Sequence, residues 1–234
     1  CCLKDLRSSS LRVTENVNEL ILPRFDSVKT IDESAFTLRH VRHLEFAAGS
    51  FPRCTSIADF NFMSMGRLEQ VVSFPTFNAV TAVGSNFLYE CKLPHNFTLP
   101  HEFLKNCSSI GQNFMINCSS TGGEITLPVL PAVKRVTHGF MRNCKFFKFS
   151  FPPKFLNNCT EIQDGFMNGC SRGGADVTIP IFPAVVQIDG SFMHNCVLKG
   201  ATLSESEVLP KLNKDDRGRV LQDIKKSLVE TAVS

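Results

Sequence analysis

Cysteine is the residue type in this chain that could most readily do chemistry, because thiolates bind metals, form disulfides and act as nucleophiles. The 234 residues contain ten cysteines, and no two are spaced as Cys-x-x-Cys. Eight fall into two columns of a repeat, the first with Cys91, Cys118, Cys144, Cys170 and Cys196, the second with Cys54, Cys107 and Cys159. In the other coils the position of the second column is occupied by valine, namely Val28, Val80, Val133 and Val185. Such a site takes a small apolar side chain, so we predict that both columns pack in the core, with no metal and no cofactor.

Two other uses of the thiols stay open. Neighbouring strands of a stacked repeat lie about 4.8 Å apart, within the Cα distance of a disulfide, so bridges between coils are an alternative. Cys1 and Cys2 stand at the start of the chain. They could be oxidised or acylated there, or could belong to a disordered end.

No catalytic set of residues accompanies the cysteines. The six histidines share no position of the repeat, and the sequence has no Gly-x-Ser-x-Gly, phosphate-loop or His-Glu-x-x-His motif. Glu124 and Asp176 both come shortly after paired glycines, but they belong to coils two apart, too distant to share a calcium ion. The sequence therefore predicts a protein that is not an enzyme, with no catalytic and no metal-binding residues.

The Phe-x-x-x-Cys tag that carries the first column has a double period. Phe62, Phe114 and Phe166 follow one another at intervals of 52 residues, because short coils of 24–25 residues alternate with long coils of 28. A fixed period predicts one elongated solenoid in which each coil buries its apolar face on its neighbours. We expect an N-terminal cap or half-coil at 1–21, seven coils at 22–202 and a C-terminal cap at 203–234.

Each coil contains one stretch with the alternation typical of a strand, just before an apolar residue and a proline. In the stretch 124–127 this places Ile125 and Leu127 in the core and Thr126 on the outer face. The stretches 148–151 and 176–179 follow the same pattern. The opposite side of each coil, such as 133–140, is expected to be a short helical turn or irregular.

The end of the chain has the spacing of an amphipathic helix. Its apolar residues are Val220, Leu221, Ile224 and Leu228, preceded by acidic residues suited to a first helical turn. We expect a helix at about 214–230 that caps the last coil; a helix that binds a partner is the alternative.

The repeat resembles the BspA-like class of leucine-rich repeats over roughly residues 20–203. The pattern is apolar-Pro-x-x-apolar, then Val/Ile-x-x-Val/Ile, as in Val133 to Val136, then a glycine ahead of the Phe-x-x-x-Cys tag. The resemblance implies an α/β-type repeat solenoid with a parallel sheet on one face, short helical or irregular segments on the other, and a capping helix. It also implies an adhesin-like role at the cell surface or outside the cell. The chain departs from the family pattern by using Phe where Leu is common, by alternating its coil length, and by carrying His40 and Gly66 in place of the tag cysteine in its first two coils.

The outer side of the predicted strands is the candidate partner-binding face. One hydroxyl recurs there in each coil, and the residue two positions earlier varies in charge, as recognition surfaces do. The residues are Ser73, Asn96, Thr98, Glu124, Thr126, Lys148, Ser150, Asp176, Thr178 and Thr202. Cross-strand packing of threonine and serine is the simpler alternative for the hydroxyls.

Four Asn-x-Ser/Thr sequons could carry glycans if the protein is secreted. We consider Asn106, Asn117 and Asn158 as the possible sites and disfavour Asn96, because it is expected within a strand. The alternative is that an asparagine before the cysteine hydrogen-bonds the backbone of its turn.

Composition narrows the function further. With 25 basic and 22 acidic residues the net charge is +3, which argues against nucleic acid and anionic membranes as partners, and no stretch approaches the ~18 apolar residues of a membrane span. We expect a non-catalytic protein–protein interaction module, a surface or secreted adhesin-like protein that binds a protein partner through its sheet face. An intracellular scaffold subunit of a larger assembly is the alternative, since unpaired cysteines suit the reducing cytoplasm.

Overall fold

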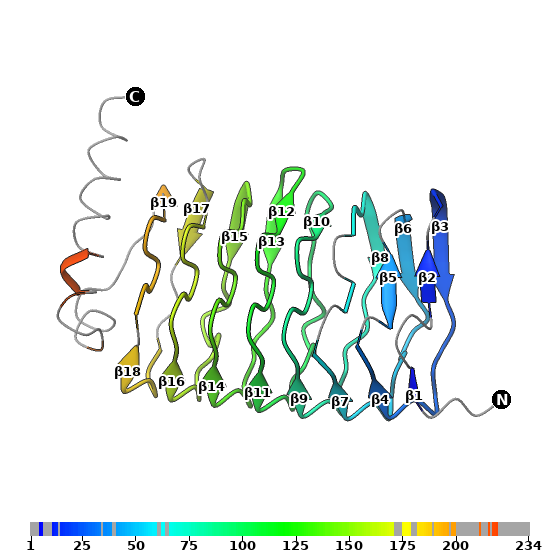
Figure 1. Cartoon of the computed structure of the whole chain (residues 1–234), viewed down its shortest axis with the longest axis horizontal. Coiled ribbons are helices and arrows are strands. Elements are labelled where there is room, and N and C mark those ends of the chain that lie inside the picture. The colour runs from blue at the N-terminus through cyan, green and yellow to red at the C-terminus, as the bar shows by residue number, and fades with distance from the viewer. Residues whose placement is uncertain are drawn as a thin grey trace.

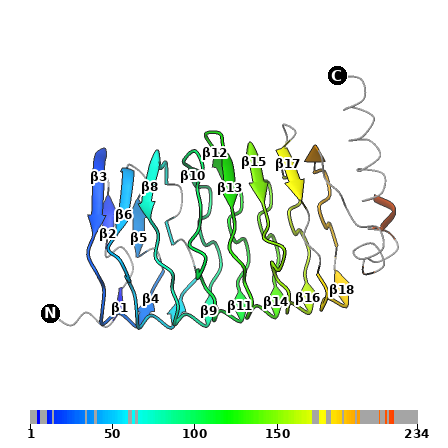
Figure 2. The same cartoon turned by 180° about the vertical axis from the view of Figure 1, so that it is seen from behind.

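Short parallel strands stack one above another along a single axis in this computed structural model (Figures 1 and 2). The structure describes residues 5–6, 11–13, 15–33, 35–38, 41–59, 62–63, 66–170, 175–178, 182–188, 190–196, 198–199, 211, 215 and 217–219. The chain is a β-solenoid whose regular part comprises about five turns. Residues 211, 215 and 217–219 are the described residues in helical conformation. The expected solenoid is confirmed, and it is built far more from strands than from helices.

The longest sheet is one that the sequence did not predict. It runs along the lower edge of Figure 1 in the order β1 (Asp5–Leu6), β4 (Thr30–Ile31), β7 (Ser56–Ile57), β9 (Ala82–Val83), β11 (Ser109–Ile110), β14 (Arg135–Val136), β16 (Glu161–Ile162) and β18 (Gln187–Ile188). The expectation of helical or irregular structure at 133–140 is therefore wrong at its centre. Each strand is two residues long, with the second residue buried, so pairing with the coils on either side stabilises it rather than any alternation of its own.

The strands predicted at the opposite edge are confirmed. A four-stranded sheet has the order β13 (Glu124–Thr126), β15 (Lys148–Ser150), β17 (Ala175–Thr178) and β19 (Leu198–Lys199). Ile125 and Leu127 are buried and Thr126 is half-exposed, as the alternation predicts. Towards the N-terminus this edge continues as a separate sheet of β3 (Val17–Leu22), β6 (Val41–Phe46) and β8 (Gln70–Ser73).

Two smaller pairs of strands complete the described sheets. One pair is β2 (Leu11–Val13) with β5 (Phe36–Leu38), and the other is β10 (Lys92–Leu93) with β12 (Ser119–Ser120). In the long coil, β12 and β13 are joined by a loop that contains Gly122 and Gly123, both at positive φ. This loop stands above its neighbours in Figure 1.

Asn96 does not lie in a strand, contrary to expectation. It occupies a turn at φ 57°, a left-handed conformation that asparagine tolerates. Its Oδ1 accepts a hydrogen bond from the backbone N–H of Glu124 at 2.9 Å. The predicted strand in this coil is reduced to a single bridge between Thr98 and Thr126.

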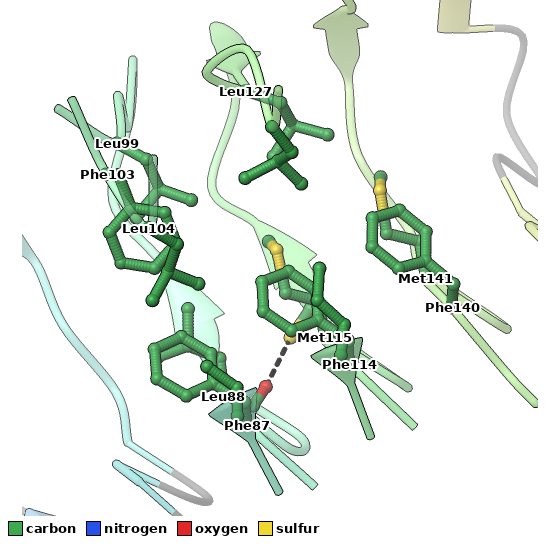
Figure 3. Packing of buried hydrophobic residues seen from close by; sticks show 14 of the residues in the cluster. Phe87, Leu88, Leu99, Phe103, Leu104, Phe114, Met115, Leu127, Phe140 and Met141 are labelled. Carbon is green, nitrogen blue, oxygen red and sulfur yellow. Dashed lines mark hydrogen bonds between the residues drawn. The ribbon is translucent and has the colours of Figure 1, made fainter. Parts of the chain in front are cut away.

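A stack of phenylalanine rings forms the centre of the core. Consecutive rings are 5.1–5.3 Å apart between centroids, and their planes differ by only 3–9°. The stack consists of Phe62, Phe87, Phe114, Phe140, Phe166 and Phe192, and Figure 3 shows three of these rings. Each tag phenylalanine stacks on the one before it, so the rings repeat once per coil along the solenoid.

Two glycines mark where coils approach most closely. A Cβ added to Gly84 would lie 2.4 Å from the backbone nitrogen of Asp59, and one added to Gly111 would lie 2.5 Å from the carbonyl carbon of Gly84. Real Cβ atoms do not come so near a backbone, so these two positions need glycine for space rather than for an unusual φ.

The C-terminal prediction falls mostly outside the described residues. Residues 215 and 217–219 of the expected helix at 214–230 are helical, and the remainder of that range is not described. At the other end, β1, β2 and β3 already join three of the sheets within the range expected to be an N-terminal cap. In the part of the chain that is described, no helix is long and apolar enough to cross a membrane.

Candidate functional site

The first cysteine column has a specific structural role. Each thiol donates a hydrogen bond to the backbone carbonyl of the residue after the tag phenylalanine of the preceding coil, for example Cys118 to Leu88 at 2.8 Å and Cys144 to Met115 at 2.8 Å. The acceptors Leu88 and Met115 have φ of 54° and 57° and are fully buried. A buried carbonyl without a hydrogen-bond partner lowers the stability of the fold. The cysteines of this column therefore supply a hydrogen-bond donor as well as a small side chain. The prediction of a core position is confirmed, and the thiol adds a hydrogen bond that an apolar side chain cannot make.

The second cysteine column makes weaker use of its thiols. Cys54, Cys107 and Cys159 each contact the carbonyl two residues further along their own chain, at 3.1–3.3 Å. Burial raises the pKa of Cys54 to about 12 and that of Cys107 to about 11, and it also raises the pKa of Cys159. These thiols stay protonated at neutral pH and are poor nucleophiles.

None of the eight described cysteines forms a disulfide. No group of three or more His, Cys, Asp or Glu side chains among the described residues is placed to hold a metal ion. The eight described cysteines are buried in the core of the coils.

The predicted partner-binding face is assembled over β13 and β15. Glu124 and Lys148 are directly opposite each other in the strand register, and their side chains form an ion pair at 3.1 Å. The side chains remain 35% and 49% exposed, respectively. Hydrogen bonding from Ser150 and the nearby Lys148 ammonium hold the pKa of Glu124 below its usual range. Thr126 and Ser150 are also partners in register, on the same outer face.

The remaining residues of this predicted face are only partly brought together. Thr98 is bridged to Thr126, and Thr178 follows Ser150 in the backbone register of β17. Ser73 lies in the separate sheet of β8, where its hydroxyl bonds the backbone of Phe46. Asp176 belongs to β17, but its side chain and that of Thr178 are outside the described part, as is all of Thr202. The contiguous face thus consists of residues on β13 and β15 and the bridge residue beside them.

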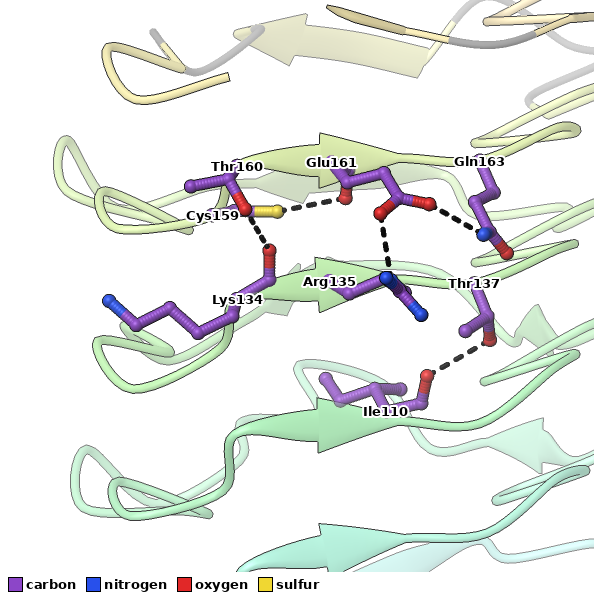
Figure 4. A network of polar contacts seen from close by, with 8 residues as sticks. All are labelled: Ile110, Lys134, Arg135, Thr137, Cys159, Thr160, Glu161 and Gln163. Atoms are coloured by element: carbon purple, nitrogen blue, oxygen red, sulfur yellow. Dashed lines mark hydrogen bonds and ion pairs between the residues drawn. The ribbon is translucent and has the colours of Figure 1, made fainter. Parts of the chain in front are cut away.

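A second polar surface covers the eight-stranded sheet, and sequence reasoning did not find it. Arg135 Nε lies 2.8 Å from Glu161 Oε2, and Gln163 Nε2 lies 2.6 Å from Glu161 Oε1 (Figure 4). The Thr160 hydroxyl donates to the carbonyl of Lys134 in the neighbouring coil at 3.1 Å. The signal was present in the alternation of exposed polar residues with buried Val136 and Ile162, but two residues are too few to reveal a period.

The three candidate glycosylation sites differ in their surroundings. Asn106 and Asn158 are exposed, and their Nδ2 atoms donate to the carbonyls of Asn78 and Pro131 in the preceding coils. This confirms backbone bonding by asparagine in these turns. Asn117 instead uses both ends of its amide with other side chains, as described below.

Comparison with protein-family models, with curated proteins and with solved structures finds no match to this chain. Its function must therefore follow from its own surfaces.

Proposed function

We propose that the chain is a non-catalytic protein-binding module of the BspA-like leucine-rich-repeat type, displayed on a cell surface or secreted, where it acts as an adhesin. The tandem Phe-x-x-x-Cys coils support the family. The function is carried by one observation: the sheet edge around β13 and β15 presents an acid, a base and hydroxyls side by side on a regular backbone. Such a surface binds by charge and hydrogen-bond complementarity and needs no cleft.

The experiment is a pull-down from the native source with three variants. Lys148→Glu places two acids opposite each other, whereas the double variant Glu124→Lys, Lys148→Glu restores the ion pair with its direction reversed. A partner with complementary charges needs the acid at position 124 and the base at position 148. We therefore expect both variants to lose the partner. Lys134→Glu, an exposed lysine on the opposite sheet, should keep it. Retention of the partner by the double variant at wild-type level would rule out this face.

An intracellular scaffold is the second candidate, and the eight buried cysteines that form no disulfide favour it. Mass spectrometry of native protein separates the two. Glycans on Asn106 or Asn158 would establish passage through the secretory pathway, whereas free thiols throughout with no glycan would favour the scaffold.

A further inference from the structure

A polar groove runs along the solenoid where the Phe-x-x-x-Cys turns end. Its volume is about 590 Å³, and it is lined by Glu90, Asn117, Ser119, Asn143, Lys145 and Gly169. This volume lies within the range of small-molecule sites. The lining comes from four successive coils, whose paired strands lie about 4.8 Å apart.

One wall of the groove is a ladder of side chains from the position before the tag cysteine. Asn117 Nδ2 donates to Glu90 Oε1 at 3.4 Å, and Asn143 Nδ2 donates to Asn117 Oδ1 at 3.2 Å. All three residues have φ of 55–56°, which lines up their side chains from coil to coil. The next position is Gly169, which has no side chain to donate to Asn143 Oδ1. Within the described part of the chain that oxygen accepts no hydrogen bond, so the ladder ends on an open acceptor.

The other wall offers open donors. Ser119 and Lys145 are paired across adjacent coils by a single bridge. Neither the Ser119 hydroxyl nor the Lys145 ammonium has a side-chain hydrogen bond or ion pair to any described residue. The groove thus combines an acceptor, a cationic donor and a hydroxyl.

These groups do not suit a peptide strand. The backbone N–H groups of Ser119 and Lys145 already donate to Cys91 and Cys118, so no free strand edge is available for β-augmentation. Side chains on one face of an extended peptide recur every ~6.8 Å, which does not match the step of the coils. An anion is also a poor ligand, because the groove contains the carboxylate of Glu90 as well as the ammonium of Lys145.

Hydroxyl groups fit the groove, because each one donates and accepts at once. In an extended β-linked oligosaccharide, successive rings advance by about one coil step. We propose that the groove binds a neutral, extended oligosaccharide along the solenoid axis, with ligand hydroxyls donating to Asn143 Oδ1 and accepting from Lys145 Nζ. This site is distinct from the protein-binding face on β13 and β15.

The test is binding of the full chain to immobilised neutral tetrasaccharides, namely β-1,4-linked chains of glucose, N-acetylglucosamine, mannose and galactose. We expect at least one to bind. Gly169→Asn should displace the open acceptor: asparagine tolerates the φ of 70° there, but its Cβ would lie 2.5 Å from Asn143 Oδ1 and must push that side chain aside. It should weaken binding about tenfold or more, and the urea midpoint of unfolding is measured alongside to show that the variant still folds.

Lys145→Ala is the second variant, because it removes a donor without touching the backbone of the ladder, and the same loss is expected. Lys134→Ala, which removes an exposed lysine on the opposite sheet, is its matched control and should bind as wild type does. Absence of binding to all four immobilised tetrasaccharides would overturn the proposal. So would binding that Lys145→Ala leaves unchanged.

Discussion

Replacing Cys144 tests whether the first cysteine column is a set of hydrogen-bond donors or merely a set of small side chains. The Cys144 thiol is the partner that the structure gives the buried carbonyl of Met115. Cys144→Val keeps the apolar volume but leaves that carbonyl unpaired, which should cost about 1–3 kcal/mol of unfolding free energy. Cys144→Ser keeps a donor, so we expect serine to be tolerated better than valine.

Cys159 provides the matched control, because valine already stands at the equivalent positions of other coils. Its thiol contacts the carbonyl of Glu161 at 3.2 Å within its own strand region. Cys159→Val should therefore be nearly neutral, within about 0.5 kcal/mol, and here valine should be tolerated better than serine. The two sites thus predict opposite orders for the same pair of substitutions.

The assay is urea unfolding of all four variants, followed by far-UV circular dichroism at pH 7 with a reducing agent present. Comparison of both the midpoint and the slope is needed, because stacked coils can unfold in parts. If valine is tolerated better than serine at both sites, the thiols are only apolar bodies and the donor role is refuted.

Three further predictions follow from the core. Phe140→Ala should cost about 3–5 kcal/mol, because the ring is buried between two stacked neighbours, whereas Phe147→Ala should be nearly neutral, since that ring is 72% exposed; equal effects in urea unfolding would contradict the stack. Gly111→Ala should cost at least ~2 kcal/mol by overpacking, seen as a lowered Tm, and an unchanged Tm would show that the coils can separate there. Because burial raises the folded-state pKa of Cys54 and Cys107 above the unfolded value, their contribution is present below about pH 8.5 and is lost as the pH rises towards 11–12. Replacing both by valine should flatten the alkaline fall in stability, and a curve of unchanged steepness would speak against it.

The repeat was sufficient to predict the axis, the phenylalanine stack and the strands around Thr126 and Ser150, because these elements recur in every coil with a readable alternation. The eight-stranded sheet was missed because strands such as Arg135–Val136 are too short to have a period and exist only through pairing with other coils. Asn96 was misplaced because its left-handed turn depends on a contact with Glu124 in the next coil.

The candidate sites show the same limit. The sequence identified Glu124 and Lys148 as neighbours on one face, since a strand register follows from aligned repeats. The sequence pattern offered backbone bonding as the alternative to glycosylation for the asparagines before the cysteines. This bonding is present at Asn106 and Asn158, whereas Asn117 bonds side chains in both neighbouring coils. Which partner an amide takes depends on its φ and on the residue one coil away, and neither is visible in a single repeat.

Long and short coils alternate along the chain, so a recombination event that keeps this alternation must add or remove two coils at once. A duplication or deletion of 52 residues, the interval between Phe62, Phe114 and Phe166, leaves each ring, thiol and loop beside its present kind of neighbour. A change of one coil would preserve the phenylalanine stack but set two tall loops next to each other. The heritable unit of this molecule is therefore a pair of coils, and recombination in steps of two changes its length while each coil keeps a neighbour of the same length class.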